Sequence, residues 1–361
     1  MIKSKSSDRD YIETRIHGFR SKLLETGKIE ELLSKYYSLQ DLVQELRQTP
    51  YKEHIETFLI SERENTALER AVNTLFSERI NKLLSISTGD IYESTNVLVS
   101  YWEMKNIHII TRRILANETL YPKDIIPLGS INEEELDYLL TISTLKELHQ
   151  YLLRKHSPLE RIVKKILYNE IQKENITEID REFYKAYYYF AFNALKENKS
   201  SKSSKVIKKS LEDLIEKENV LILSDLLYQC IKDELDDKIL SDDLFFITYK
   251  RFNAKEMIEA IRKRDYSRMF EYLQRGTYKE AFEGIDTKNA FIDEIDFLPA
   301  KLDKIFLKKQ IKKKFRFNLE NMLISYYWQS YAENRDIQTI TRGIIGKLDQ
   351  YTVGRMLFLV R

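Results

Sequence analysis

Five aspartates crowd one short stretch of this chain, and carboxylate oxygens are the ligands that calcium prefers in proteins. They are Asp233, Asp236, Asp237, Asp242 and Asp243. A calcium-binding loop also requires a fixed order of ligands and a central glycine for its sharp turn, and residues 233–243 contain no glycine. We therefore interpret the cluster as the solvated end of a helix and predict no metal site there.

Other catalytic patterns are also missing from the sequence. The histidines do not pair with cysteine or carboxylates at the spacing of metal ligands, and no H-E-x-x-H occurs: His17, His54, His108, His149 and His156. There is no phosphate-binding glycine loop and no G-x-S-x-G nucleophile motif. Cys230 lies in an apolar helical stretch, where a small buried side chain is expected. The sequence thus predicts no catalytic residue, no cofactor site and no metal site.

One segment is strongly basic. Lys304–Arg316 reads KIFLKKQIKKKFR, with Phe306 and Phe315 among the cations, a pattern found on surfaces that bind nucleic acid or anionic lipid. The whole chain is nearly neutral, however, with 59 basic and 57 acidic residues. Three aliphatic residues of the segment also follow the spacing of a buried helix face: Ile305, Leu307 and Ile311. We expect a solvated amphipathic helix here and no nucleic-acid partner.

The chain repeats itself over long distances. Residues 100–114 read SYWEMKNIHIITRRI, residues 330–344 read SYAENRDIQTITRGI, and the two windows agree at 8 of 15 positions. The matched residues include Arg112 with Arg342, and Asn106 keeps its polar character in Asp336. Agreement in polar as well as apolar positions indicates internal repetition rather than two unrelated amphipathic helices.

A second pattern indicates a third copy. Three apolar triplets with +3 and +7 spacing each follow a residue that can cap a helix: Ser38 before Leu39, Leu42 and Leu46; Thr144 before Leu145, Leu148 and Leu152; Asp265 before Tyr266, Met269 and Leu273. Tyr51 and Tyr278 follow the outer two triplets by five residues, and Ser157-Pro158 occupies that place in the middle copy.

The middle copy carries a weaker version of the first pattern. Glu218-Asn219-Val220 keeps the apolar spacing, but Asp225 stands where the other copies have arginine. A third pattern, beginning at Gly129, recurs from Gly346 at an offset of 217 residues. We therefore predict three similar domains of roughly normal domain size. Their predicted ranges are 1–128, 129–240 with a Lys/Ser-rich loop over 196–209, and 241–361.

Composition predicts that these domains are all-α. Gly (9) and Pro (5) are scarce, so the chain has few tight turns and few helix breakers. Apolar residues from Leu159 to Leu167 follow a helical stripe, and no sustained alternation predicts a strand. The aromatic run within 184–192 is expected to pack in a core. No apolar run is long enough to span a membrane, and the single cysteine suggests a reducing, cytoplasmic setting.

Arg112 and Arg342 are the most sharply defined polar repeats. As structural arginines they would lie near a helix C-terminus or pair with a carboxylate such as Glu103 or Glu333. As functional residues they would contact a partner protein. The spacing of the isoleucines around them places both guanidinium groups at a domain edge. The six candidate structural or interface residues are Arg112, Arg342, Asn106, Asp336, Tyr51 and Tyr278.

These residues resemble the family of C and d subunits of V-type rotary ATPases, and more closely its bacterial and archaeal C members. The resemblance rests on five stretches in order along nearly the whole chain: Tyr11-x-x-x-Arg15 with Leu23-Leu24, Leu39-x-x-Leu42 with Thr49-Pro50-Tyr51, Asn106-Ile107 with Arg112, Ile126-Pro127-x-Gly129, and Asp336-Ile337-x-x-Ile340-x-Arg342. The middle copy departs most from the family pattern.

The resemblance implies a funnel of three helical domains around a pseudo-threefold axis. It also implies a non-catalytic subunit, peripheral to the cytoplasmic face of a membrane, that caps a proteolipid ring and receives the shaft of the central stalk. The alternative is an all-helical adaptor with unrelated protein partners. An enzyme with an unrecognised helical site is a third possibility, although no acid–base pair or nucleophile favours it.

Overall fold

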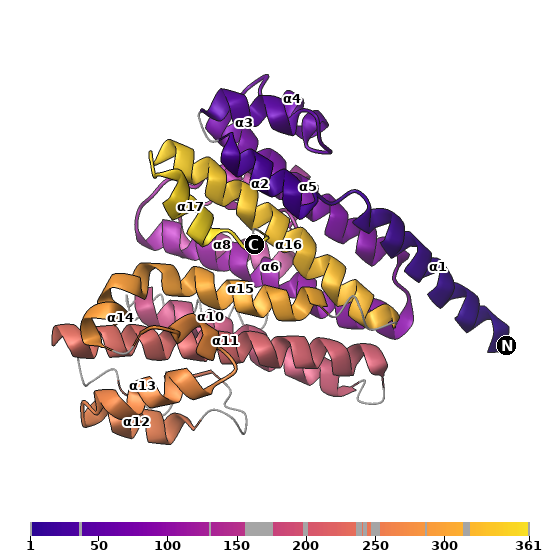
Figure 1. The fold of residues 1–361 in the computed structure, drawn as a ribbon. Coiled ribbons are helices and arrows are strands. Elements are labelled where there is room, and N and C mark those ends of the chain that lie inside the picture. Colours follow the sequence, from indigo (N-terminus) through magenta and orange to yellow (C-terminus); the bar gives the residue numbers. More distant parts are fainter. Residues whose placement is uncertain are drawn as a thin grey trace.

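A computed structural model describes residues 2–35, 38–129, 131–155, 176–197, 201–235, 240, 244–246, 253–285, 287–312 and 318–359 of the chain. All regular secondary structure in these ranges is helical (Figure 1), which confirms the predicted all-α class. Among the described residues, none of the helices combines the length and the hydrophobicity of a membrane-spanning segment.

Six long helices form three consecutive pairs at the centre of the molecule. They are α5 (Glu64–Ile86) with α6 (Gly89–Leu115), α10 (Ile176–Glu197) with α11 (Lys202–Lys232), and α15 (Leu298–Ile311) with α16 (Leu319–Ile345). We call these the first, second and third pairs. The two helices of each pair are in contact with each other.

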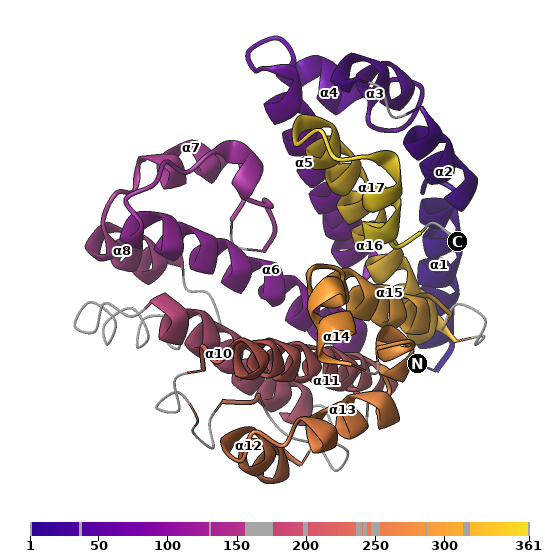
Figure 2. The ribbon, with the colours of Figure 1, turned by 60° about the vertical axis from the view of Figure 1, so that its left-hand side comes forward.

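Short helices precede each pair and lie in three groups toward the outside of the molecule (Figure 2). The first group is α2 (Thr26–Ser34), α3 (Leu39–Leu46) and α4 (Lys52–Phe58); the second is α7 (Glu133–Thr141) and α8 (Leu145–Lys155). The third is α12 (Ala254–Arg262), α13 (Tyr266–Arg275), η3 (Lys279–Phe282), α14 (Lys288–Glu294) and η4 (Ile295–Phe297). A further short helix, η1 (Pro122–Asp124), joins α6 to α7.

The pairs contact one another in a cyclic order. The first helix of each pair packs against the second helix of the preceding pair: α10 against α6, α15 against α11, and α5 against α16. The last of these contacts joins the first pair to the third. Helices far apart in the sequence are therefore neighbours, and the contacts return to their starting point.

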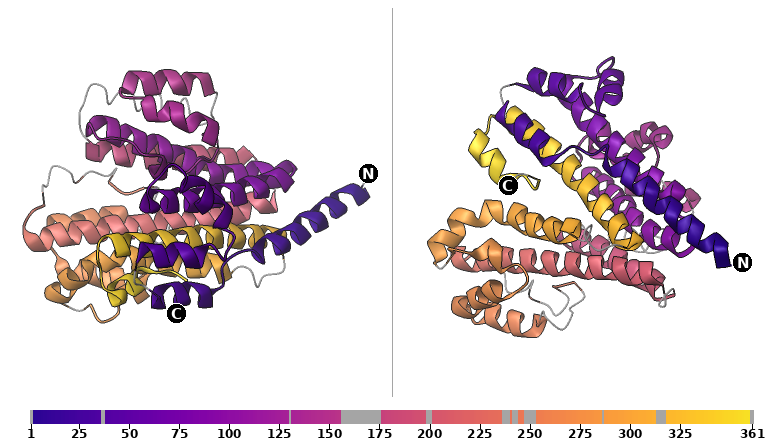
Figure 3. Two further views of the ribbon diagram at one scale, coloured as in Figure 1. Left: turned by 90° about the horizontal axis from the view of Figure 1, so that it is seen from above. Right: turned by 45° about the vertical axis from the view of Figure 1, so that its right-hand side comes forward.

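Both ends of the chain contribute to this closure. The buried cluster around Tyr51 combines residues of α2–α5 with Ile337 and Ile340 of α16 and with Val353 of α17 (Gln350–Met356). The first helix, α1 (Ile2–Arg20), also packs on α5 and α16, through Ile12 and Ile16. Its N-terminus projects beyond the rest of the molecule (Figure 3).

The 230-residue repeat recurs in the helices themselves. Helices α6 and α16 both contain 27 residues, and their first residues, Gly89 and Leu319, and their last, Leu115 and Ile345, are all 230 positions apart. Buried and half-buried residues also occur at the same positions along 101–110 and along 331–340. The three predicted caps also form, because Ser38, Thr144 and Asp265 each accept a backbone N–H three residues on: Asp41 at 3.2 Å, Glu147 at 3.2 Å and Arg268 at 3.1 Å.

The predicted Lys/Ser-rich loop over 196–209 is wrong for most of its length. Helix α10 continues to Glu197, and α11 begins at Lys202 with Ser201 as its cap. Ser203 and Ser204 are buried, and Ser204 Oγ lies 3.1 Å from Ser94 Oγ of α6. Small side chains let the two backbones approach closely, so tertiary packing stabilises a helix that composition alone did not predict.

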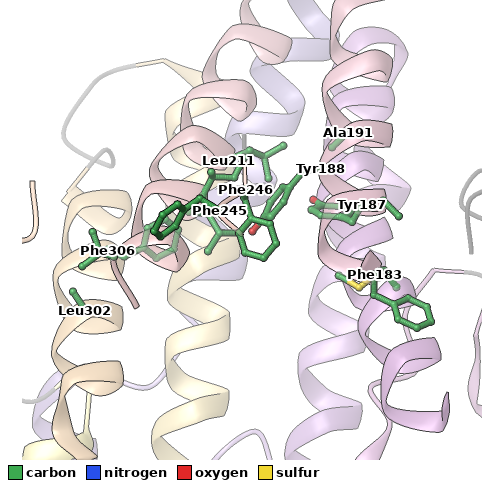
Figure 4. Close-up of a cluster of buried hydrophobic side chains, with 14 of the residues drawn as sticks. Phe183, Tyr187, Tyr188, Ala191, Leu211, Phe245, Phe246, Leu302 and Phe306 are labelled. Atoms are coloured by element: carbon green, nitrogen blue, oxygen red, sulfur yellow. The ribbon is translucent and has the colours of Figure 1, made fainter. Parts of the chain in front are cut away.

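Much of the predicted aromatic run of α10 lies in the core, but the prediction is wrong for Tyr189, which is 65% exposed. Phe183 and Tyr187 pack against α6, where the Phe183 ring lies 5.4 Å from that of His108 and the Tyr187 hydroxyl donates to the Val97 carbonyl. Tyr188 lies on the other side of α10, with its ring 5.4 Å from that of the buried Phe246 (Figure 4). The predicted burial of Cys230 is confirmed, and Asp233 ends α11 in the left-handed region at φ 58°, as expected for a helix end. The other four aspartates of that cluster lie outside the described residues.

Candidate functional site

Three equivalent polar residues hold returning segments of backbone. Asn106 donates to the Ile126 carbonyl at 2.6 Å and accepts the Ile126 N–H at 3.1 Å. Asn219 Oδ1 accepts the Phe246 N–H at 2.8 Å. Asp336 accepts the N–H groups of Phe358 and Leu359 at 2.7 and 2.8 Å. Each side chain is at most 1% exposed, so it satisfies backbone groups inside the protein rather than contacting a partner.

Sequence patterns single out only two of these three residues as candidates, Asn106 and Asp336. Asn219 aligns with them in Glu218-Asn219-Val220, and that alignment is the signal that could have found it. Asp336 differs from the two asparagines because it is ionisable. Burial raises its pKa to about 7, although the N–H groups of Phe358 and Leu359, and then the cations Lys304 and Arg335, act to lower it.

Tyr51 attaches the first group of short helices to the third pair. Its hydroxyl donates to Glu333 Oε1 on α16 at 2.7 Å, and Arg79 Nη1 of α5 lies 2.8 Å from the same oxygen. The other oxygen of Glu333 accepts the Leu24 N–H at 2.8 Å. Burial and then the Glu333 charge raise the pKa of Tyr51 well above its ordinary value. The carboxylate is fully buried and has three partners from the N-terminal part of the chain.

Tyr278 plays the corresponding part between the third group and the second pair. Its hydroxyl donates to the Asp213 carbonyl of α11 at 2.8 Å, and the neighbouring Thr277 hydroxyl donates to Glu216 Oε1 at 2.8 Å. Each tyrosine therefore joins a group of short helices to the preceding long-helix pair, in the cyclic order of the helix contacts. Ser157-Pro158, the equivalent of these tyrosines in the middle copy, lies outside the described residues.

Arg112 and Arg342 occupy equivalent positions, three residues before the last residue of α6 and of α16. Both are exposed, as expected for residues at a domain edge. Arg342 Nε donates to Glu69 Oε1 of α5 at 2.7 Å, and Lys123 Nζ lies 3.0 Å from the other oxygen of Glu69. The expected partner Glu333 was wrong for Arg342, because Arg79, Tyr51 and the Leu24 N–H occupy that carboxylate.

A second charged contact lies between the second and third pairs. Lys217 Nζ of α11 is 2.5 Å from Asp303 Oδ1 of α15 and 2.9 Å from Glu218 Oε1. Nearby, Asp213 accepts from Lys309 Nζ at 2.7 Å and from Gln310 Nε2 at 3.0 Å. Lys304 and Lys309 of the basic segment therefore lie beside acidic residues of neighbouring helices, while 313–317 lie outside the described residues.

This arrangement fixes helices against one another and assembles no catalytic constellation among the side chains described above. Within the described ranges, no group of three or more histidine, cysteine, aspartate or glutamate residues is placed to hold a metal ion. The buried polar residues instead satisfy one another across the contacts between helix pairs. The geometry therefore supports a structural role, in which these contacts hold the helix pairs in fixed positions.

Comparison with known proteins gives a consistent result. The family model described as ATP synthase (C/AC39) subunit matches residues 12–356. The C subunit of the A-type ATP synthase of Methanosarcina mazei is 21% identical over 287 residues, which cover 78% of this chain and 74% of that protein. Since the family match spans nearly all of the helices described above, this chain belongs to the ATP synthase (C/AC39) subunit family.

Proposed function

We propose that the protein is the non-catalytic central-stalk subunit that joins the rotor shaft of a V-type rotary ATPase or ATP synthase to its membrane ring. In this role it caps the proteolipid ring on the cytoplasmic face and receives the tip of the shaft. The observation that carries the proposal is membership of the C/AC39 family over residues 12–356. The matched M. mazei protein is itself named as part of an ATP synthase.

The proposed architecture is a funnel of three domains, 1–128, 129–240 and 241–361, around a pseudo-threefold axis. The cyclic contacts support it, because each pair uses its first helix against the second helix of the preceding pair. Such head-to-tail contacts produce a ring when their rotation closes. The proposed funnel would receive the end of the shaft.

A protein that transmits torque has to resist relative movement of its parts. Charged contacts join two of the three interfaces between pairs that would carry the load. They are the buried pair of Arg79 with Glu333, between the first and third, and the partly buried pair of Lys217 with Asp303, between the second and third. At the remaining interface, Tyr187 of α10 donates to the Val97 carbonyl of α6 at 3.1 Å, between the second and first pairs. Hydrogen bonds and ion pairs are directional, so they favour one arrangement of the helices over arrangements in which the helices are shifted along one another.

Crosslinking in native membranes tests the proposal. The full-length chain carrying an affinity tag should yield crosslinked peptides from the proteolipid ring and from the rotor shaft, and the purified chain alone should hydrolyse no ATP. The same tag on an unrelated protein controls for background. Recovery of partners from outside the ATPase, without ring or shaft peptides, would support the adaptor function instead.

A further inference from the structure

A basic cavity of about 250 Å³ lies where α5, α6, η1 and α16 meet. Its lining includes a single acidic residue, Asp124, and five cationic ones: Lys105, Arg113, Lys123, Arg335 and Arg342. Asn106 and Ile126, whose hydrogen bonds are described above, also line it. An excess of cations around a partly enclosed space is the electrostatic environment that binds an anion.

The three cations at the ends of the helices already have acidic partners. Arg342 and Lys123 share Glu69, at 2.7 and 3.0 Å. Arg113 pairs with Glu118, and its Nη2 lies 3.9 Å from Asp124 Oδ2. These residues contribute to the potential of the cavity, but their charges are largely balanced.

Lys105 and Arg335 have no such partner. They occupy equivalent positions in the repeat, one on α6 and one on α16, and no carboxylate among the described residues lies within ion-pair distance of either. Lys105 Nζ lies 5.1 Å from the ring centroid of Trp102 and 5.7 Å from that of Tyr101. Arg335 Nε is buried without a hydrogen-bond partner. A buried guanidinium donor without an acceptor is costly unless a ligand supplies one.

Two of the acidic residues near this pair contact another cation. Glu218 and Asp303 both contact Lys217, at 2.9 and 2.5 Å. Glu218 and Asp303 act on the charge of Lys105, and Asp303 and Asp336 act on that of Arg335. Burial, and then the neighbouring Arg335 charge, lower the pKa of Lys105 to about 8. The two cations thus repel each other in a partly desolvated space.

We propose that this cavity binds a phosphoryl dianion between Lys105 and Arg335. A phosphoryl group has enough oxygen acceptors to contact both cations at once, and its negative charge would offset their mutual repulsion. The planar fork of Arg335 suits two phosphoryl oxygens, and the ammonium group of Lys105 binds phosphate as a point charge. The ligand is either free inorganic phosphate or the phosphate end of a small phosphorylated metabolite, for which the cavity has room.

Calorimetric titration of the full-length chain tests the site, with inorganic phosphate as the first probe at constant ionic strength and neutral pH. We expect saturable binding, weakened about tenfold or more by Lys105→Gln or Arg335→Gln, since tenfold corresponds to the loss of one modest charged contact. Lys232→Gln is the matched control, because Lys232 Nζ lies 5.8 Å from the Tyr228 ring centroid on an exposed surface without this cavity. The control should bind phosphate as the parent chain does.

Titrations with glycerol 3-phosphate and ATP distinguish the sources: tighter binding of an ester than of phosphate assigns the site to a metabolite, and the reverse assigns it to the free ion. Absence of phosphate binding up to about 10 mM would overturn the site. So would equal binding of acetate, which would indicate a carboxylate ligand, or undiminished binding by both glutamine variants.

If a glutamine variant fails to fold, Arg335→Lys provides the second test. It keeps the positive charge but removes the guanidinium fork, so it should fold and bind phosphate more weakly than the parent. Unchanged affinity in this variant would contradict the proposed contact. Every titration uses the isolated chain, so the result does not depend on whether the proposed stalk function is correct.

Discussion

Glu333 and Arg79 form a buried ion pair, 2.8 Å apart, between two helices that are separated by more than half of the chain. The side chains are 0% and 7% exposed. Tyr51 donates to the same carboxylate oxygen. These three residues join the N-terminal part of the chain to its C-terminal part. We therefore expect them to stabilise the contact between the first and third pairs, which closes the cyclic arrangement.

We expect Glu333→Ala to lower the free energy of unfolding by about 3–5 kcal/mol, because it leaves the Arg79 charge buried without its partner. Urea unfolding followed by circular dichroism measures this. Lys82→Ala, which breaks a solvent-exposed pair with Glu78, is the control and should change stability far less. A similar effect of both substitutions would contradict a closing role for Glu333.

The two repeated tyrosines should differ in the cost of losing their hydroxyl groups. Tyr51→Phe removes a hydrogen bond to a buried carboxylate and should cost about 1.5–3 kcal/mol, whereas Tyr278→Phe removes one to a neutral carbonyl and should cost about 1 kcal/mol. Because Phe keeps the ring, packing is preserved in both variants. Chemical denaturation of the two proteins side by side gives the comparison, and the reverse order would contradict it.

Asp336 should make stability depend on pH. Its folded pKa of about 7 lies above its ordinary value of 3.8, so the folded state binds its proton more tightly than the unfolded state. The resulting stabilisation is complete below about pH 4 and is lost as pH rises through about 7, by at most about 1.4 kcal/mol per pH unit. Urea midpoints at about pH 5 and about pH 8 measure the change.

Asp336→Asn isolates this contribution. The amide cannot ionise, so the part of the pH dependence due to residue 336 should disappear. The amide of the variant also has an NH2 group, which would face the N–H of Phe358 or Leu359 and could not accept it. Asn106 avoids this conflict because its amide meets one N–H and one carbonyl. We therefore expect a pH-independent loss of about 1–3 kcal/mol. An unchanged pH profile in the variant would place the titrating group elsewhere.

The close contact of α11 with α6 should not tolerate a larger side chain at position 204. Ser204→Leu inserts a bulky group opposite Ser94, so we expect overpacking to cost about 1–3 kcal/mol. Lys205→Leu, one residue along and exposed, is the matched control on the same helix and should be nearly neutral. Equal stabilities in thermal unfolding would mean that α11 does not pack this closely.

Sequence patterns located much of the secondary structure because the signals they use are local. Apolar residues three and four apart lie on one helix face, and a cap bonds to N–H groups within three residues. The caps Ser38, Thr144 and Asp265 formed for that reason. The same local logic failed at residues 202–209, where buried serines pack a helix of unfavourable composition against α6.

The helical class, the family and the repeated positions, including Asn106 with Asp336, were predicted correctly from the sequence because they are carried by spacing along one chain. The partners of the polar side chains were not, because they lie on distant helices. Arg342 pairs with Glu69 instead of Glu333, and Lys105 and Arg335 line the same cavity. Such pairings depend on how each helix is rotated against a distant neighbour, and the period of an isolated helix does not contain that information.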